Sequence, residues 1–371
     1  MSKNENARSG RELLNHTRKE RCYPTSCKAF NLSIGRFDPI TGEPGIPEGT
    51  PGEWFGPNAS CKSAMWEGLA ANIMKMDPKA KVFALLSEDP DPERWESVGI
   101  DLDRITTWTY YNPDPDACLT SAEDGLNLLC ELVSEDMDYK LTVVDSIKAL
   151  VVEDQVFGKK AGELKDFSDS EAPAIRARLM NRFLGNHKVS NKARAILFMV
   201  NQVSESIGPN FNIGQMVKTK TSGGREKEHY SKLRVECNSA PPDATDKPVT
   251  HKLFGNKIFN KLRCIFFLQK NKFGFPFRKT NVDFDLETKR FTNERNCLDF
   301  AEYLGIISRS GAANWNLDGK SIKGRAAAEK YLLDNPEYED SLWKQIYPRH
   351  KELYNDKPSK SSKDDIEDDD E

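Results

Sequence analysis

The stretch that decides the fold is GEWFGPNASCKSAMW, residues 52–66. A short run typical of a β-strand leads into a turn that begins at Gly56, and a helical pattern starts after Ser63. The turn has the spacing GxxxxGK followed by Ser or Thr, except that Cys61 occupies the position of the second glycine. A strand that enters a helix through such a loop predicts a phosphate-binding site.

Each part of this loop suits a nucleotide, so we predict ATP and Mg²⁺ as cofactors. Backbone N–H groups and the helix N-terminus hold a phosphate, the Lys62 ammonium adds positive charge, and the Ser63 hydroxyl is a ligand for Mg²⁺. Because a side chain replaces a glycine, Cys61 has to turn away from the phosphates. The predicted nucleotide-binding residues of the loop are Gly56, Pro57, Asn58, Ala59, Ser60, Cys61, Lys62 and Ser63.

Polar residues follow three further predicted strands. KLTVVDS ends in Asp145, which we predict to reach the magnesium shell together with Ser63, and AILFMVNQ ends in Gln202, which can reach a terminal phosphate. The strand KVFALLS points to Glu88 as the general base that orients or deprotonates water, with Asp89 as an alternative. The competing interpretation is an ordinary sheet whose strands end in polar residues by chance.

The chain has 371 residues, long enough for one large α/β core with smaller appendages. From residue 52 onward, short β runs alternate with helical segments, which predicts a mainly parallel central sheet with helices packed on its faces. Two polar stretches, 153–172 and 203–229, interrupt the alternation and are expected to be functional loops. After about residue 292 the sequence becomes helical and compact, which favours a separate small domain.

Composition favours a soluble protein of a reducing compartment. Hydrophobic residues make up 37% and charged residues 30%, and the mean hydropathy is −0.67. The sequence has no apolar run of the roughly 18 residues that a membrane helix requires, and its N-terminus lacks the apolar stretch of a secretory signal. The eight cysteines form no CxxC pair, so free thiols are expected. We therefore expect a cytoplasmic location and no membrane partner.

Charge is distributed unevenly along the chain. The last thirteen residues hold seven acidic residues and two lysines, a net of −5, whereas the whole chain has −4, so the remaining residues carry +1. Residues 249–290 contain ten Lys or Arg against three Asp or Glu, and residues 217–234 contain six against two. Basic zones beside an acidic tail suit a polyanion partner, although a solvated surface with a disordered tail explains the charges equally simply.

These motifs, in this order, resemble the RecA-type strand-exchange recombinases, including the phage-encoded UvsX group. The similarity covers nearly the whole chain and ends in an acidic tail. The stretches that carry it, besides the phosphate loop, are TVVDS (142–146), FMVNQ (198–202), SIGPNF (206–211), TKTSGGREKEHY (219–230), QKNKFGFPF (269–277) and a C-terminal segment (298–346).

The resemblance implies a RecA-like P-loop ATPase core that forms helical filaments on single-stranded DNA and exchanges strands with homologous duplex DNA. By position, Gln202 senses the γ-phosphate, and Lys270 and Lys272 reach into the ATP site of a neighbouring protomer. The residues that the resemblance assigns to DNA binding are Arg176, Arg178, Phe211, Lys218, Lys220, Gly223, Gly224 and Arg225. For Phe211 an ordinary loop anchor, and for the basic residues a solvated surface, remain alternatives.

The resemblance also implies the remaining parts of the molecule. Asp91, Arg94 and Trp95 lie where the family binds the adenosine, and either Arg94 or Trp95 can cover the adenine ring. Single-strand-binding and loader proteins are further expected partners, and a phage-encoded member would act in the cytoplasm of its host. The expected segments are an N-terminal helical oligomerisation segment (1–24), the core (25–291), a small C-terminal α/β domain (292–356) and a disordered acidic tail (357–371).

Two other functions compete with an ATP-hydrolysing recombinase. The substitution at Cys61 and the position of Glu88 leave open a filament protein that coats DNA and uses nucleotide only as a switch for assembly. A hexameric helicase on the same core is the third possibility, and the C-terminal segment and acidic tail speak against it.

Overall fold

The computed structural model describes residues 8–110, 120–157, 164–165, 174–206, 218–240, 249–250, 257–258, 260–311 and 313–355. The chain divides into two compact units, Met1–Asn293 and Glu294–Glu371. This division lies next to residue 292, where the composition changes. The predicted acidic tail lies outside the described residues. No helix in the described ranges is long and apolar enough to cross a bilayer.

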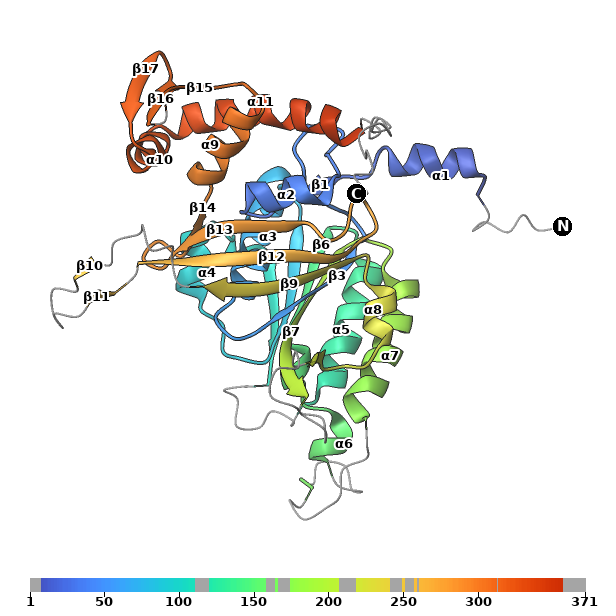
Figure 1. The fold of residues 1–371 in the computed structure, drawn as a ribbon. Helices are drawn as coiled ribbons and strands as arrows, with labels where there is room; N and C mark the ends of the chain where they lie inside the picture. Colours follow the sequence, from blue (N-terminus) through green and yellow to red (C-terminus); the bar gives the residue numbers. More distant parts are fainter. Residues whose placement is uncertain are drawn as a thin grey trace, which may run out of the picture. The chain divides into compact units, whose positions relative to one another are not determined.

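The first unit is a mixed α/β structure (Figure 1). Its strands are β1 (Cys22–Tyr23), β2 (Ile46–Pro47), β3 (Pro51–Gly56), β4 (Lys81–Leu86), β5 (Ile105–Thr109), β6 (Tyr139–Asp145), β7 (Ile196–Ser206), β8 (Lys218–Thr221), β9 (Leu233–Ala240), β10 (Val249–Thr250), β11 (Lys257–Ile258), β12 (Lys261–Asn271), β13 (Lys279–Asp285) and β14 (Arg290–Thr292). Its helices are α1 (Gly10–Thr17), α2 (Lys28–Ile34), α3 (Lys62–Met76), α4 (Pro92–Val98), α5 (Ala122–Glu135), α6 (Glu153–Val156), α7 (Ile175–Ser190) and α8 (Glu226–Tyr230), with the 3-10 helices η1 (Leu102–Arg104) and η2 (Ile147–Ala149).

One large sheet organises this unit, with the strand order β14-β13-β12-β9-β3-β7-β6-β4-β5. The strands from β9 to β5 are parallel to their neighbours, whereas β12, β13 and β14 extend the sheet in antiparallel pairing. The predicted α/β fold with a mainly parallel sheet is therefore confirmed. Because β3, β4, β6 and β7 are parallel, their carboxyl ends meet at one edge, where α/β proteins bind ligands.

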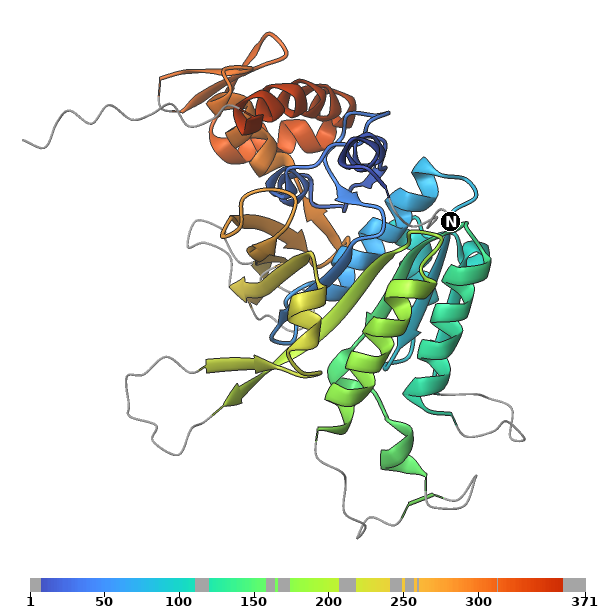
Figure 2. The same cartoon turned by 90° about the vertical axis from the view of Figure 1, so that its right-hand side faces the viewer.

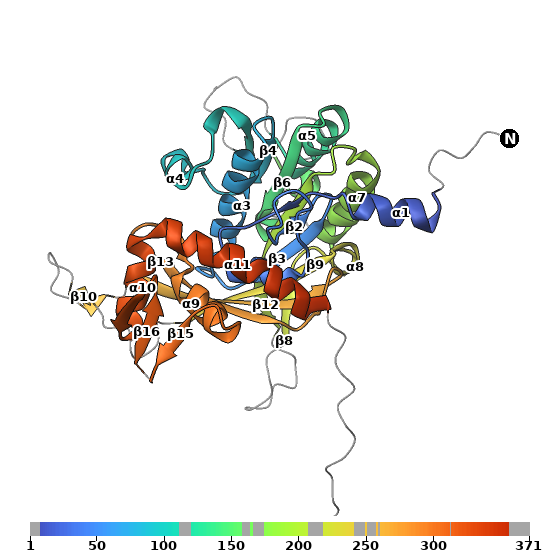
Figure 3. The ribbon, with the colours of Figure 1, turned by 90° about the horizontal axis from the view of Figure 1, so that it is seen from above.

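Alternating side chains of the sheet pack into two separate hydrophobic cores, one on each face. On one face, Val82 and Val143 pack with apolar residues of α3 and of the antiparallel strands. On the other face, Phe83 and Val144 pack with residues of α5 and α7. Figure 3 shows α3 and α4 on one side of the parallel strands and α5 and α7 on the other. Both faces are buried, as parallel sheets require, so the site at their carboxyl edge rests on a rigid base.

Strand β7 is longer than the sequence pattern predicts. AILFMVNQ ends at Gln202, but the strand continues to Ser206 and pairs with β8 as an antiparallel hairpin that extends beyond the sheet (Figure 2). The predicted loop at 203–229 therefore contains regular structure, because residues 203–206 and 218–221 form strands and α8 begins at Glu226. Cross-strand hydrogen bonds of the hairpin, rather than apolar periodicity, stabilise this extension, and a polar hairpin gives no apolar signal.

The second unit is built from α9 (Glu294–Tyr303), the antiparallel sheet of β15 (Ser308–Ser310), β16 (Asn314–Leu317) and β17 (Lys320–Lys323), α10 (Arg325–Asp334) and α11 (Pro336–Asn355). Its core contains Leu298, Trp315, Leu332, Trp343 and Ile346, all buried. The indole N–H of Trp343 donates to Glu339 at 2.7 Å, so the buried polar group of this tryptophan is satisfied.

Candidate nucleotide site and DNA-facing loops

The loop between β3 and α3 has the geometry of an anion site. A Cβ atom at Gly56 would lie 1.8 Å from the carbonyl oxygen of Cys237, so only glycine fits where the loop begins. Cys61 has a φ of 60° and precedes the first turn of α3, and its side chain packs against the core. Cys61 thus adopts the left-handed conformation that glycine adopts more readily. No side chain caps α3, which leaves the N–H groups of its first turn to bind an anion.

Lys62 lies folded over the loop, with only 8% of its surface exposed. Its ammonium donates to the carbonyl oxygens of Gly56 and Pro57 at 3.2 and 2.6 Å and to the Ser60 hydroxyl at 3.1 Å. Burial lowers the pKa of Lys62. The ion pairs of the described residues include none for Lys62: neutral oxygens accept its hydrogen bonds, and the charge of Asp145 acts on it at longer range. A phosphate would supply the missing negative charge.

Asp145 ends β6 and faces the start of α3. Its Oδ2 accepts hydrogen bonds from the Ser63 hydroxyl at 2.7 Å and from the indole N–H of Trp66 at 3.0 Å. Burial raises the pKa of Asp145, the two hydrogen bonds lower it, the nearby Glu88 raises it, and the charge of Lys62 lowers it. Within the described ranges Asp145 has no Lys or Arg partner. A partly buried carboxylate beside a hydroxyl, with hydrogen bonds from neutral donors, fits the oxygen ligands that Mg²⁺ prefers.

A cavity of about 500 Å³ lies beside the loop, within the size range of ligand sites. Glu88, Asp145 and Gln202 line it together with the loop residues. Gln202 lies opposite Gly56 in the ladder between β3 and β7. Glu88 is exposed and follows β4 by two residues. The structure therefore brings together the three strand-end residues that the sequence singles out.

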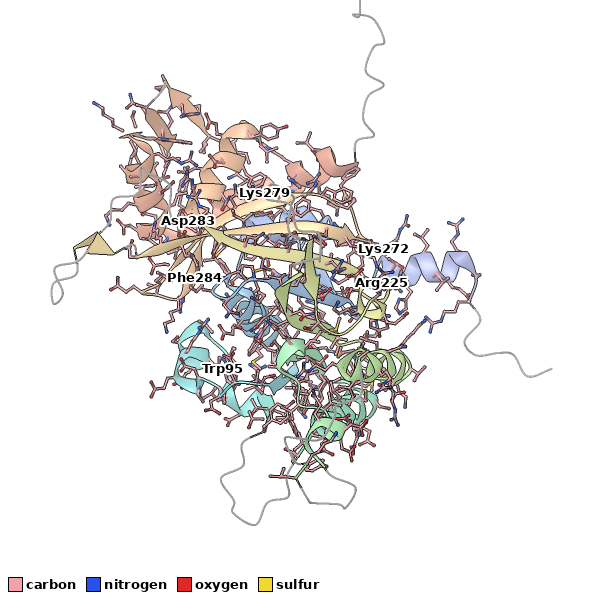
Figure 4. The ribbon with its side chains drawn as sticks, turned by 60° about the horizontal axis from the view of Figure 1, so that its bottom comes forward. Trp95, Arg225, Lys272, Lys279, Asp283 and Phe284 are labelled. Carbon is pink, nitrogen blue, oxygen red and sulfur yellow. The ribbon has the colours of Figure 1, made fainter. Side chains whose placement is uncertain are left out.

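A smaller cavity of about 170 Å³ adjoins the site at α4. The guanidinium of Arg94 donates to Glu67 at 2.5 Å, and the carboxylate of Asp91 accepts from the Arg94 backbone N–H at 3.0 Å. Trp95, labelled in Figure 4, is only 4% exposed. Its ring packs edge-on against Trp66 with centroids 5.8 Å apart. Both Arg94 and Trp95 line this smaller cavity, but of the two only Arg94 also lines the larger one.

A second polar cluster lies inside the sheet. Glu53, on β3 and fully buried, accepts from Arg234 at 2.8 Å and from Asn201 at 2.9 Å, and its carboxylate lies 3.4 Å from the ammonium of Lys227. Lys227 is also fully buried and donates to the Thr221 hydroxyl at 2.7 Å. The cluster joins the strand before the phosphate loop, the residue before Gln202, and the end of the β7–β8 hairpin.

The base of this hairpin packs closely onto α7. Lys218 and Lys220 lie on β8, opposite Ser206 and Ser204 of β7. Gly223 and Gly224 follow with φ of 90° and 78°, a conformation that favours glycine. A Cβ atom at Gly224 would lie 3.0 Å from the Cβ of Ala177 on α7. The glycine pair thus lets the two predicted DNA-binding segments approach each other.

The other predicted DNA-binding residues lie on the same part of the first unit. Arg176 and Arg178 lie in the first turn of α7, where Arg176 donates to the carbonyl oxygen of Leu150 at 3.0 Å and Arg178 is exposed. Arg225 is exposed just before α8 (Figure 4). Phe211 lies outside the described residues. The structure gathers these arginines around the hairpin base without a ligand that would define their roles.

Lys270 lies near the end of β12, and Lys272 directly follows the strand. Lys270 pairs with Arg234 at the start of β9, and its ammonium donates to the carbonyl oxygens of Glu228 and His229 at 2.6 and 3.2 Å. Burial and the charges of Lys272 and Arg234 lower the pKa of Lys270. The residues lining the cavity beside the phosphate loop include neither lysine in the described structure. Both therefore lie away from the ATP site of their own chain.

Comparison with known proteins agrees with this arrangement. Residues 21–288 match the family model described as the RecA N-terminal domain. The chain belongs to the RecA family. The match covers the whole sheet except its last strand, including the phosphate loop, Asp145 and Gln202. The resemblance to RecA-type recombinases that the sequence suggests, and the function in DNA recombination and repair that it implies, are thereby confirmed.

Individual RecA proteins are similar over most of the chain. A Protein RecA of Limosilactobacillus reuteri is 28% identical over 351 residues, which cover 92% of this chain and 86% of that protein. One of Mycoplasma mobile is 28% identical over 328 residues, covering 88% and 89%. One of Chloroflexus aurantiacus is 26% identical over 324 residues, covering 86% and 80%. Identities of 26–28% support properties at the level of the family. RecA proteins as a family are DNA-dependent ATPases that use ATP with Mg²⁺ and form filaments on DNA.

Sequence reasoning missed several residues of this RecA-type site. Trp66 and Glu67 lie one turn into α3, where they look like ordinary helix residues, although they contact Asp145 and Arg94. Glu53 and Lys227 were missed as well. The available signal was a carboxylate inside the otherwise apolar strand GEWF, because a buried charge needs a partner.

Proposed function

We propose that this protein is an ATP- and Mg²⁺-dependent recombinase that assembles as a helical filament on single-stranded DNA and exchanges strands with a homologous duplex. One observation carries the proposal: Gln202 lines the phosphate cavity, and its strand continues directly into the hairpin of the predicted second DNA loop. A single strand therefore links the two sites. Membership in the RecA family supports the same reading.

At the phosphate site we propose that the N–H groups of the loop and of the first turn of α3 bind the phosphates. Lys62 leaves its contacts with Gly56 and Pro57 and pairs with the β- and γ-phosphates. Ser63 and Asp145 would hold Mg²⁺, which would supply positive charge beside the phosphates. Their 2.7 Å contact supports this assignment, because the two oxygens already converge.

Glu88 is the proposed general base. It is exposed, lines the cavity on the side away from the loop strand, and can accept a proton from water that attacks the γ-phosphate. Asp89 lines the smaller cavity and is the second candidate. Gln202 reports the γ-phosphate to the hairpin. For the adenine ring of ATP we propose that Arg94, held by Glu67, covers its face in preference to the buried Trp95.

Adjacent protomers complete the site in this proposal. Lys270 and Lys272 are too far along β12 to serve their own loop, so they act on the ATP of a neighbour and stabilise charge on the transferring phosphoryl group. The predicted oligomerisation segment, 1–24, contains α1, whose Leu13 and Leu14 are 52% and 43% exposed. We propose that these leucines pack on the next protomer of the filament.

The DNA contacts are proposed to be independent of sequence. Arg176, Arg178 and Arg225 pair with phosphates, and the backbone of the glycine pair allows close approach. The remaining predicted contacts are Lys218, Lys220 and Phe211, of which Phe211 would stack on bases. The unit after residue 293 contributes to capture of duplex DNA, and the acidic tail competes with DNA for basic surface.

Single-strand-binding and loader proteins are proposed as further partners, and the cytoplasm as the place of action, because that is where the DNA substrate of a RecA-type protein lies. A filament protein that only coats DNA remains the second candidate, since the exposed Glu88 has no hydrogen bond to fix it among the described contacts.

The test is steady-state ATP hydrolysis by the full-length protein with and without single-stranded DNA. We expect strong stimulation by DNA, loss of turnover in Lys62→Ala, and loss of turnover with retained DNA binding in Glu88→Gln. DNA binding without hydrolysis in the unmodified protein would favour the coating filament. Turnover in Lys62→Ala equal to that of the unmodified protein would contradict the proposed site itself.

A further inference from the structure

The phosphate loop contains a cysteine pair that the proposed function does not use. Cys61 and Cys264 are both free thiols, and their Sγ atoms lie 2.9 Å apart. A disulfide bond is about 2.05 Å long, so the sulfurs would have to approach by only about 0.9 Å to form one. The two residues are 203 positions apart in the chain, which means that the fold, and not the local sequence, brings them together.

The surroundings give the two thiols different roles. Cys61 is partly exposed and lines the 500 Å³ cavity, which is the side from which a small molecule can approach it. Cys264 is fully buried in the middle of β12, between β9 and β13. Its hydrogen bond to Cys61, followed by burial, raises the pKa of the Cys264 thiol. An oxidant therefore meets Cys61 first, and Cys264 is placed to react with the modified Cys61.

We propose that Cys61 and Cys264 are a modification site for small-molecule disulfides, such as glutathione disulfide, that closes into an intramolecular disulfide bond. The Cys61 thiolate attacks one sulfur of glutathione disulfide and releases one glutathione, which takes up a proton. Cys264 then loses its proton, attacks Sγ of Cys61 and releases the second glutathione. Two protein thiols are oxidised to one disulfide, and one glutathione disulfide is reduced to two glutathione molecules.

The bond would fix the phosphate loop. Cys61 lies between Ser60 and Lys62 and precedes the first turn of α3, whereas Cys264 belongs to a strand held on both sides. Tying Cys61 to β12 holds the loop in the conformation in which Lys62 contacts Gly56 and the loop oxygens. This consequence rests on the proposed function, because it assumes that the loop must adjust to bind ATP. The formation of the disulfide does not depend on that assumption.

ATP binding and disulfide formation must affect each other equally. If the disulfide weakens ATP binding, bound ATP must disfavour the disulfide by the same factor. In a compartment that keeps thiols reduced, such a bond forms only under oxidative conditions. Cys61, the residue that departs from the phosphate-loop motif, would then make ATP binding sensitive to the redox state.

Peptide mapping of the full-length protein tests the site itself. The reduced protein is incubated with glutathione disulfide under native conditions, blocked and digested with trypsin without reduction. Cleavage after Lys and Arg releases Cys61 in residues 37–62 and Cys264 in residues 264–270, each peptide with a single cysteine. We expect these two peptides to be linked in the unmodified protein and in Cys237→Ala, which removes a neighbouring buried thiol. Only glutathione adducts of Cys61, or links between other cysteines, would overturn the proposal.

Binding of a fluorescent ATP analogue tests the consequence. We expect oxidation to weaken binding about tenfold or more, a reducing agent to restore it, and Cys61→Ser to be insensitive to oxidation. A linked protein that binds the analogue as tightly as the reduced one overturns the locking of the loop. A reduced protein that does not bind the analogue contradicts the proposed ATP site and, with it, the proposed locking of the loop. In that case the peptide map still decides whether the disulfide forms.

Discussion

Two carboxylates on the same sheet, the fully buried Glu53 and the partly buried Asp145, have opposite surroundings. Glu53, inside the sheet, contacts the cations of Arg234 and Lys227 and the amide of Asn201. Among the described residues, Asp145, at the carboxyl edge, accepts hydrogen bonds from the neutral Ser63 and Trp66, and the charge of Lys62 acts on it without a direct ion pair. Glu53 is therefore compensated by direct ion pairs within the chain, whereas Asp145 has none in the part of the chain that the structure describes. The difference separates a carboxylate that stabilises the fold from one that is kept for a bound cation.

The largest expected effect is the loss of charge at the compensated carboxylate. Glu53→Gln leaves Lys227 buried without its anion and Arg234 with the ion pair to Glu228, so we expect the free energy of unfolding to fall by about 3–5 kcal/mol. Urea denaturation measures the change. A loss below about 1 kcal/mol, the range of exposed ion pairs, would remove the contrast between the two carboxylates.

Asp145→Asn should lower the rate of ATP hydrolysis and leave the stability of the fold unchanged or higher. We expect ATP hydrolysis to fall on the order of 10²–10³-fold, because the ligand for the cation is lost. Because burial raises the pKa of Asp145, its favourable contribution to folding is present at low pH and is lost as pH rises through that pKa. In the absence of Mg²⁺, urea denaturation at pH 7 should therefore show the variant at least as stable as the unmodified protein. Lower stability of the variant at pH 7 would contradict this reading.

Lys227→Met should destabilise the fold less than Glu53→Gln and more than Asp145→Asn. Arg234 still compensates Glu53, so we expect a smaller loss of about 1–3 kcal/mol from the broken hydrogen bonds to Thr221 and Gly224. These bonds hold the end of the hairpin, so the stimulation of ATP hydrolysis by DNA should fall more than hydrolysis without DNA. An equal fall in both rates would restrict Lys227 to stability. Lys232→Met, on a lysine outside the cluster, is the matched control.

The smallest effect is expected at Trp66. Trp66→Phe keeps the ring that packs against Trp95 and removes only the N–H that donates to Asp145. Loss of one hydrogen bond to a charged group costs about 1.5–3 kcal/mol at most, and Mg²⁺ can compensate part of it. We expect the Mg²⁺ concentration for half-maximal hydrolysis to change severalfold at nearly unchanged maximal rate. No change in that concentration would show that Trp66 does not position Asp145.

The sequence predicted the edge of the sheet better than its interior. Lys62, Ser63, Asp145 and Gln202 could be brought together because parallel strands place their carboxyl ends at one edge. The Glu53–Lys227 contact joins residues 174 positions apart and follows no periodicity, so no local pattern could reveal it.

The site at α4 and the β7–β8 hairpin show the same limit. The spacing from Pro92 could not decide between Arg94 and Trp95, because burial of Trp95 depends on Trp66 from another helix. The hairpin was read as a loop because its polar residues pair through backbone hydrogen bonds, which side-chain patterns do not record.

The most direct test of the account is thermal unfolding of the unmodified protein and of Asp145→Asn, each with and without ATP and Mg²⁺. A ligand that binds only the folded state raises the melting temperature. We predict a clear rise for the unmodified protein only when ATP and Mg²⁺ are both present. Asp145→Asn should start at an equal or higher temperature and gain little. An equal rise in both proteins would contradict the claim that Asp145 is kept for the cation of the nucleotide site.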